Sequence, residues 1–179
     1  MRWYWIDRFL EFESGRYAKA VKNVSLAEDH LHDHFPYRPL MPPSLVIEGL
    51  AQTGGLLVCE YNDFAEKVVL AKVAKARFHG EAVPGDRLIY TTTLESIAEE
   101  GATVTGTAYN GDELYAEVEI MFAHLNDPRL GRLFDPRTFL HMMRLLGAFD
   151  VGRDRNGQPL KPPAALLEAC RESARGEVG

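Results

Sequence analysis

The stretch from His34 to Cys59 constrains the fold of this chain more than any other. It contains four prolines and ends in a run of residues that is apolar almost all round. A proline at the first helical position has no N–H group to leave unpaired, so Pro42-Pro43 predicts that a helix starts here. We expect this helix over 44–59, and its apolar side chains on every side indicate that protein encloses it. It is too short for a membrane span, which takes about 20 residues.

Two polar residues, Glu48 and Gln52, interrupt the apolar surface of this predicted helix. They are one turn apart and therefore lie on the same face. Burying a carboxylate is unfavourable unless the group is paired, hydrogen-bonded or protonated. Glu48 is thus a candidate for chemistry, with a capped structural carboxylate as the alternative. Gln52 is then expected to support the site.

Beyond the helix, the sequence predicts strands joined by short turns. They are expected over 68–78, 87–95, 102–109 and 113–125. Residues 83–86, Val-Pro-Gly-Asp, have the proline and glycine of a type II turn. Asn110-Gly111 lies between alternating runs and is a strong hairpin signal. Together with an earlier strand over 17–25, these segments predict an α+β protein with an antiparallel sheet wrapped around the helix.

The remaining segments predict a one-domain core followed by an extension. Residues 1–13 mix aromatic and acidic side chains, which suits a short amphipathic helix or an irregular lead-in. The loop over 26–43 is long and of the kind that often contains functional residues. We expect the main domain over 1–125, and over 126–179 an extension of loops and short helices, with helices predicted over 139–149 and 164–175. Because one curved sheet covers only part of the central helix, we also expect a homodimer.

Composition excludes several classes of protein. The formal net charge of -6 argues against general nucleic-acid binding, which needs phosphate-neutralising lysines and arginines. Cys59 and Cys170 provide neither a disulfide framework nor a metal-ligand spacing. His30, His32 and His34 alternate, but no second ligand group accompanies them at a recognisable spacing. We therefore expect no metal and no cofactor. The N-terminus lacks the pattern of a signal peptide, so we expect a cytoplasmic protein that does not bind membranes.

Five motifs, in a fixed order, resemble the β-hydroxyacyl-ACP dehydratase family of the hot-dog fold over about residues 4–125. They are KNVSLAEDHLHDHFP, RPLMPP, IEGLAQ, AKARFHGEAVPGD and GDELYAEVEIMFA. The resemblance implies a sheet around a central helix, a dimer often assembled into a trimer of dimers, and a substrate tunnel at the dimer interface. It implies a catalytic histidine at His34 and a catalytic carboxylate at Glu48, which come from different subunits in each site. The glutamate resembles the branch that dehydrates without isomerising the double bond.

Two positions depart from the family pattern. Tyr37 and Pro43 replace glycines, and we count both, together with Ser44 and Gln52, as candidate substrate-binding residues. Tyr37 adds bulk beside the expected site and either narrows the tunnel or supplies a hydroxyl. The family's glycine at position 43 donates its N–H to the thioester carbonyl, and proline has none. Losing such a donor costs ~2.7–4 kcal/mol in the transition state. The N–H of Ser44 would substitute if the helix start shifts slightly.

The chemistry of these residue types agrees with the resemblance. Dehydration of a 3-hydroxyacyl thioester removes a C2 proton and expels the C3 hydroxyl. A histidine with an ordinary pKa of ~6.5 takes the proton, and a carboxyl in a dry pocket assists the leaving hydroxyl. Backbone N–H groups at a helix start hold the thioester oxygen as charge develops.

Three hypotheses follow for this chain. The first is a 3-hydroxyacyl-ACP dehydratase of fatty-acid or related acyl-chain biosynthesis, acting on an acyl carrier protein or coenzyme A thioester. The second is a non-catalytic hot-dog subunit that binds an acyl thioester, and Pro43 favours it. The third is a hot-dog thioesterase in which the same carboxylate activates water. The extension over 126–179 lies outside the resemblance and serves either as packing or oligomer surface, or as a cover over the tunnel mouth.

Overall fold

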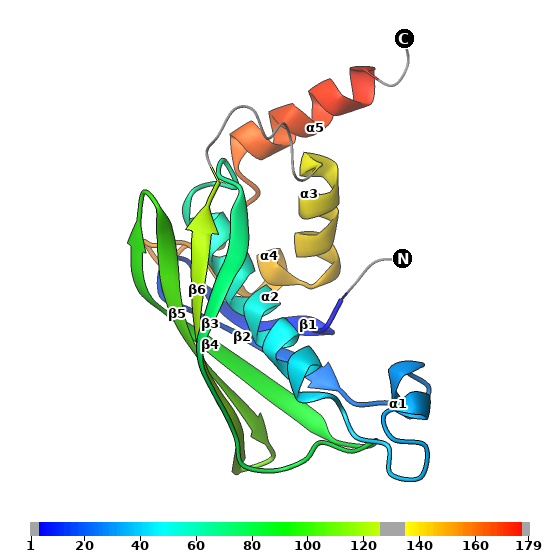
Figure 1. Cartoon of the computed structure of the whole chain (residues 1–179). Helices are drawn as coiled ribbons and strands as arrows, with labels where there is room; N and C mark the ends of the chain where they lie inside the picture. The colour runs from blue at the N-terminus through cyan, green and yellow to red at the C-terminus, as the bar shows by residue number, and fades with distance from the viewer. Residues whose placement is uncertain (1–3, 126–134, 177–179) are drawn as a thin grey trace.

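A curved antiparallel sheet wraps around one long helix in the protein. The computed structural model describes residues 4–125 and 135–176, and within them the sheet has seven strands in the order β3-β6-β5-β4-β2-β1-β7. The strands are β1 (Arg8–Glu13), β2 (Tyr17–Asn23), β3 (Val68–Phe78), β4 (Arg87–Ala98), β5 (Gly101–Asn110), β6 (Glu113–His124) and β7 (Gly152–Arg153). The helices are α1 (His30–Asp33), α2 (Pro43–Tyr61), α3 (Pro136–Leu145), α4 (Ala148–Val151) and α5 (Ala164–Gly176). Figure 1 shows α2 lying in the concave side of the sheet.

The strands follow the predicted pattern closely. Neighbouring strands pair antiparallel, except for the short parallel contact of β1 with β7. The predicted type II turn is confirmed, because the Asp86 N–H donates to the Val83 carbonyl at 3.0 Å and Gly85 has a φ of +103°. The hairpin after β5 differs by one residue from the prediction. Asn110 already pairs with Glu113, so that the two-residue loop is formed by 111–112.

The prediction of a helix or an irregular lead-in over residues 1–13 is wrong, because Arg8–Glu13 form strand β1. Phe9 and Phe12 are almost completely buried, although they are three positions apart. The register of β1 against β2 shifts between Phe9 and Glu11, which is the mark of a β-bulge. The extra residue turns both rings to the core. The bulge therefore gives the buried aromatic residues of β1 the three-residue spacing that is typical of a helix.

Helix α2 forms the centre of the core and runs slightly longer than the predicted 44–59. Buried side chains occur on most of its faces, as the apolar sequence predicts. The helix approaches its neighbours most closely at Gly49. A Cβ atom there would lie 2.8 Å from the Trp5 carbonyl oxygen and would overlap the Tyr90 ring. Because such contacts cannot be relieved without moving backbone, only glycine fits at this position.

Of the predicted extension over 126–179, the structure describes residues 135–176, and the part that contains α3 and α4 packs against the core. The Phe9 N–H donates to the Leu146 carbonyl at 2.8 Å, and Phe12 pairs with Gly152 of β7. Farther along α3, Phe139 lies against Phe64, with ring centroids 5.7 Å apart. The predicted helices over 139–149 and 164–175 correspond to α3 with α4, and to α5. The domain boundary at 125 stays a prediction, and within the described residues no helix is long and apolar enough to cross a membrane.

Candidate active site

A cavity of about 520 Å³ runs along one side of α2. Its volume lies within the range of ~300–1,000 Å³ that is common for small-molecule sites. On the α2 side it is lined by residues spaced three or four apart, which places them on one helix face. These are Glu48, Ala51, Gln52, Gly55, Leu56 and Cys59. Strands β3 and β6 contribute Val68, Leu70 and Phe122, and Tyr4 and residues of α3 line the remaining side. The candidate carboxylate thus opens into an apolar cavity.

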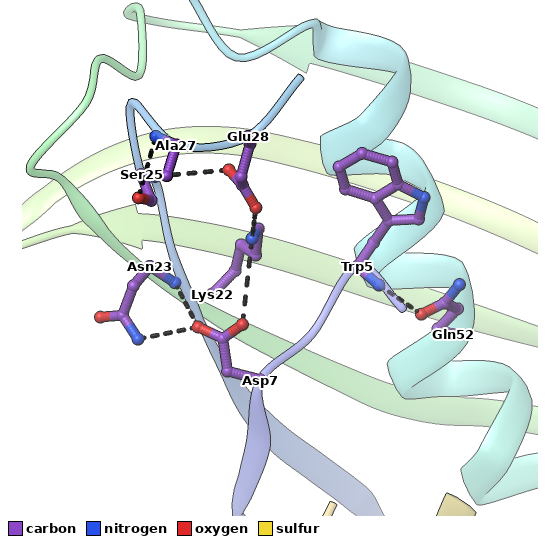
Figure 2. Close-up of polar contacts among 8 residues, drawn as sticks. All are labelled: Trp5, Asp7, Lys22, Asn23, Ser25, Ala27, Glu28 and Gln52. Atoms are coloured by element: carbon purple, nitrogen blue, oxygen red, sulfur yellow. Dashed lines mark hydrogen bonds and ion pairs between the residues drawn. The ribbon is translucent and has the colours of Figure 1, made fainter. Parts of the chain in front are cut away.

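Glu48 is held by a short chain of hydrogen bonds that starts at the protein backbone. The Trp5 N–H donates to Gln52 Oε1 at 2.9 Å, and Gln52 Nε2 donates to Glu48 Oε1 at 2.9 Å. Figure 2 shows the first of these contacts. Because a backbone N–H can only donate, it fixes which end of the Gln52 amide faces Glu48. The amide therefore holds Oε1 of Glu48 as an acceptor.

His34 lies in the loop that follows α1, and it is partly exposed. Its Nδ1 is 3.0 Å from the Leu40 carbonyl oxygen, and its ring stacks on Phe35 with the centroids 4.3 Å apart. Because a carbonyl oxygen can only accept, Nδ1 carries the hydrogen in the neutral ring. This leaves Nε2 as the basic nitrogen. The neutral ring therefore presents Nε2 as its acceptor nitrogen, but His34 does not line the cavity that contains Glu48.

An ion cluster around the buried Lys22 anchors the loop that leads to His34. Lys22 is only 5% exposed at its side chain, and its Nζ pairs with Glu28 and lies 3.9 Å from Asp7 Oδ1. Figure 2 shows these contacts, together with Asn23, which donates to Asp7 from its N–H and from Nδ2, each at 2.7 Å. The Ser25 N–H also donates to Glu28, at 3.3 Å. A buried ammonium needs such partners, so the cluster fixes the chain just before α1.

The alternating histidines point to different partners. His32 Nε2 lies 3.1 Å from the Leu26 carbonyl oxygen, whereas the His30 ring packs edge-on against Trp5 with the centroids 5.0 Å apart. Burial lowers the pKa of His30, which favours its neutral form. Within 4–125 and 135–176, no group of three His, Cys, Asp or Glu residues is arranged to hold a metal ion.

The other predicted site residues lie along the loop and at the start of α2. Tyr37 is fully exposed, and Pro43 and Ser44 are the first two residues of α2 on the surface. The Leu45 N–H already donates to the Pro42 carbonyl at 2.9 Å. Ser44 therefore provides the first N–H of the helix, in the turn where such groups lack an intrahelical acceptor. Of the six predicted residues, the chain brings Glu48 and Gln52 together in the cavity and leaves the other four outside it.

Sequence reasoning missed two contributions to this site. Trp5 orients Gln52 through its backbone, which no side-chain pattern reveals. Phe139 and Met142 of α3 line the cavity, although they lie far along the chain from Glu48. The amphipathic pattern over 139–149 predicts their helix but not where it docks.

Comparisons with known proteins identify the class. Residues 3–119 match the FabA-like domain family. Among curated relatives, the 3-hydroxyacyl-[acyl-carrier-protein] dehydratase FabZ of Pelotomaculum thermopropionicum is 42% identical over 119 residues, which are 66% of this chain and 85% of that protein. FabZ of Symbiobacterium thermophilum is 41% identical over 119 residues, 66% of this chain and 84% of that protein. The chain therefore belongs to the FabA-like domain family and, within it, to the β-hydroxyacyl-ACP dehydratases.

Solved structures agree on the fold. The dehydratase heterocomplex ApeI:P from Xenorhabdus doucetiae superposes with a TM-score of 0.57 at 14% identity, covering 70% of this chain and 85% of that chain. The protein smu.793 from Streptococcus mutans, bound to acetyl CoA, superposes with a TM-score of 0.56 at 14% identity, covering 70% of this chain and 93% of that chain. The predicted hot-dog fold is confirmed.

Proposed function

We propose that this protein dehydrates a 3-hydroxyacyl thioester, carried by acyl carrier protein, to the trans-2-enoyl thioester in fatty-acid biosynthesis. The observation that most supports this is Glu48, held by Gln52 and open to an apolar cavity. It occurs in a chain that is about 40% identical to 3-hydroxyacyl-ACP dehydratases. The reaction takes place in the cytoplasm, as the sequence predicts.

His34 and Glu48 would divide the two proton transfers of this reaction. Nε2 of His34 takes the proton from C2, and the electron pair of that C–H bond forms the C2–C3 double bond. The C3–O bond breaks as the free oxygen of Glu48 gives its proton to the hydroxyl, so that water leaves. The proton on His34 then returns to Glu48, directly or through the released water. Negative charge on the thioester oxygen is stabilised by the N–H of Ser44.

The site is expected to form between two copies of the chain. His34 lies outside the cavity of its own chain, so the base has to come from elsewhere. Among the described strands, β3 pairs only with β6, which leaves one long edge of β3 unpaired. Long free edges are normally covered, because unpaired backbone groups invite another strand. Pairing of two copies along β3 would bring the two cavities together, and further assembly into a trimer of dimers is compatible with it.

The test is turnover of 3-hydroxyacyl-ACP by the purified protein, with products followed by mass spectrometry. Formation of enoyl-ACP and water is the expected result. Release of the free 3-hydroxy acid would instead indicate a thioesterase. Tight binding of unchanged substrate would indicate a non-catalytic subunit, the alternative that Pro43 favours. Repeating the assay with the coenzyme A thioester distinguishes the carrier.

A further inference from the structure

We propose that helix α3 of the extension forms the far wall of the acyl pocket and limits the length of the acyl chain. The inference rests on the proposed function and adds a specificity determinant to it. The residues concerned are Phe139 and Met142, which lie beyond the residues that match the family. The length limit would therefore be a property of this chain and not of the FabA-like core.

The cavity extends from the reactive carboxylate toward the opposite end of α2. It is lined by Glu48 near the start of the helix and by Cys59 near its end. These residues are eleven positions apart, and at ~1.5 Å per residue they span about 16 Å. The cavity is thus elongated along the helix, which suits a linear chain whose thioester lies beside Glu48.

Phe139 lines the cavity at the end that lies away from Glu48. Its ring packs on Phe64, with the centroids 5.7 Å apart. Phe64 in turn follows the end of α2, where its N–H donates to the Cys59 carbonyl at 2.8 Å. Phe139 therefore belongs to the Cys59 end of the cavity. Helices α2 and α3 both line the cavity, and in Figure 1 α3 lies to the right of α2 whereas β5 and β6 lie to its left.

The chemistry of the walls fits an alkyl chain. Leu56, Phe122 and Met142 line the cavity with apolar surface, and Met is a side chain that adapts to irregular spaces. Asp135 also lines it, at the start of α3, where its carboxylate accepts from the Arg137 N–H at 3.0 Å. A chain that reached this carboxylate would place apolar carbon against a charge, which is unfavourable. Bulk from Phe139 and polarity from Asp135 thus meet at the α3 side of the pocket.

Helix α3 is anchored firmly enough to act as a wall. Asp135 caps its first turn, and Leu140 and Met143 are buried beneath it. At its end, the Leu146 carbonyl accepts from the Phe9 N–H at 2.8 Å, which ties the helix to β1. A bulky substrate would have to displace packed residues in order to move α3.

The test compares kcat/KM for even-numbered 3-hydroxyacyl thioesters of increasing length. Met142→Ala removes side-chain volume from the wall and should move the longest accepted chain up by at least one two-carbon step. Met142→Trp should move it down. Accommodating or rejecting one methylene changes kcat/KM by ~10- to 200-fold.

The matched control is Leu145→Ala on the same helix, because Leu145 is 56% exposed and does not line the cavity. Phe139→Ala should also move the limit up, provided that thermal melting shows an intact fold.

A second readout separates this inference from the proposed function. Binding of saturated acyl thioesters of the same lengths, measured by calorimetry, reports on the pocket without turnover. If wild-type protein forms no enoyl product but the variants shift the length limit for binding, the dehydratase proposal fails and the pocket assignment stands. If wild-type protein is active and both Met142 variants keep its length profile, the pocket assignment is overturned.

Discussion

The two groups assigned to catalysis are held in contrasting ways. Glu48 lies on the longest helix, faces a cavity, and is oriented through Gln52 by the backbone of Trp5. His34 lies in a surface loop outside that cavity, and its ring is held by one hydrogen bond to the Leu40 carbonyl. Core packing of α2 positions Glu48. Local polar contacts and the ion cluster around Lys22 position the loop that contains His34.

The proposed site between two copies would explain the difference. A residue that acts inside its own chain can be fixed by the core, as Glu48 is. A residue offered to another copy of the chain has to lie on the surface, where a loop on a rigid scaffold is the usual carrier. Each chain would then contribute half of two equivalent sites, as a symmetric dimer requires.

The strongest test of this contrast mixes two inactive variants. His34→Ala and Glu48→Gln should each lower kcat by ~10²–10⁴, the usual contribution of general acid–base groups. If the two groups of a site come from different protomers, each mixed dimer regains one intact site. Random mixing then restores about one quarter of wild-type activity, since half of the dimers are mixed and each has one of two sites.

The mixture must be unfolded and refolded together so that protomers exchange. Each variant refolded alone, at the same total concentration, is the control. Absence of any recovery, although native mass spectrometry shows mixed dimers, would place both groups of a site in one chain and remove the contrast.

The second test concerns the N–H group of Ser44, at the start of α2 between His34 and Glu48 in the sequence. Proline is tolerated in the first turn, so Ser44→Pro should fold normally while removing the N–H assigned to the thioester oxygen. Loss of one such donor should lower kcat by ~10²–10³ with little change in the melting temperature. Ser44→Ala keeps the N–H and should stay near wild type. Equal activity of the two variants would contradict the assignment to Ser44.

The part of the site that lies on α2 was largely predictable from the sequence. Strand β1 and the contact of α3 with the cavity were not. Pro42-Pro43 marks the start of α2, and the apolar run identifies its burial, because both signals are local. Strand β1 was mispredicted because its bulge places Phe9 and Phe12 three positions apart, as a helix would. The wall formed by Met142 depends on docking of α3 from a distant part of the chain. No spacing within α3 encodes that contact.

The loop that leads to His34 can be destabilised without changing His34 itself. Lys22→Met removes the cation between Glu28 and Asp7 and leaves two carboxylates beside a buried apolar side chain. We expect a loss of about 1–3 kcal/mol in unfolding free energy, moderated by the partial exposure of both carboxylates. Activity should fall as well, because the loop before α1 loses its anchor.

Lys19→Met is the matched control on the same strand. Lys19 pairs with Glu11 at 2.9 Å, but both side chains are partly exposed, so the loss should stay below about 1 kcal/mol. Urea unfolding of the two variants measures the difference. Equal losses would mean that the ion cluster around Lys22 does not stabilise the loop.

The smallest expected effect concerns a second carboxylate on α2, which contrasts with Glu48. Glu60 is 7% exposed, and its Oε2 has no hydrogen-bond partner among the described residues. Burial raises the pKa of Glu60 above its ordinary 4.5.

Above about pH 4.5, the folded state therefore binds more protons at Glu60 than the unfolded state does. The free energy of unfolding then decreases as pH rises through the raised pKa. Glu60→Gln removes the charge and should raise the melting temperature at neutral pH. The gain should disappear below about pH 4.5, where wild-type Glu60 is neutral in both states. A gain of equal size at all pH values would show that charge burial is not its cause.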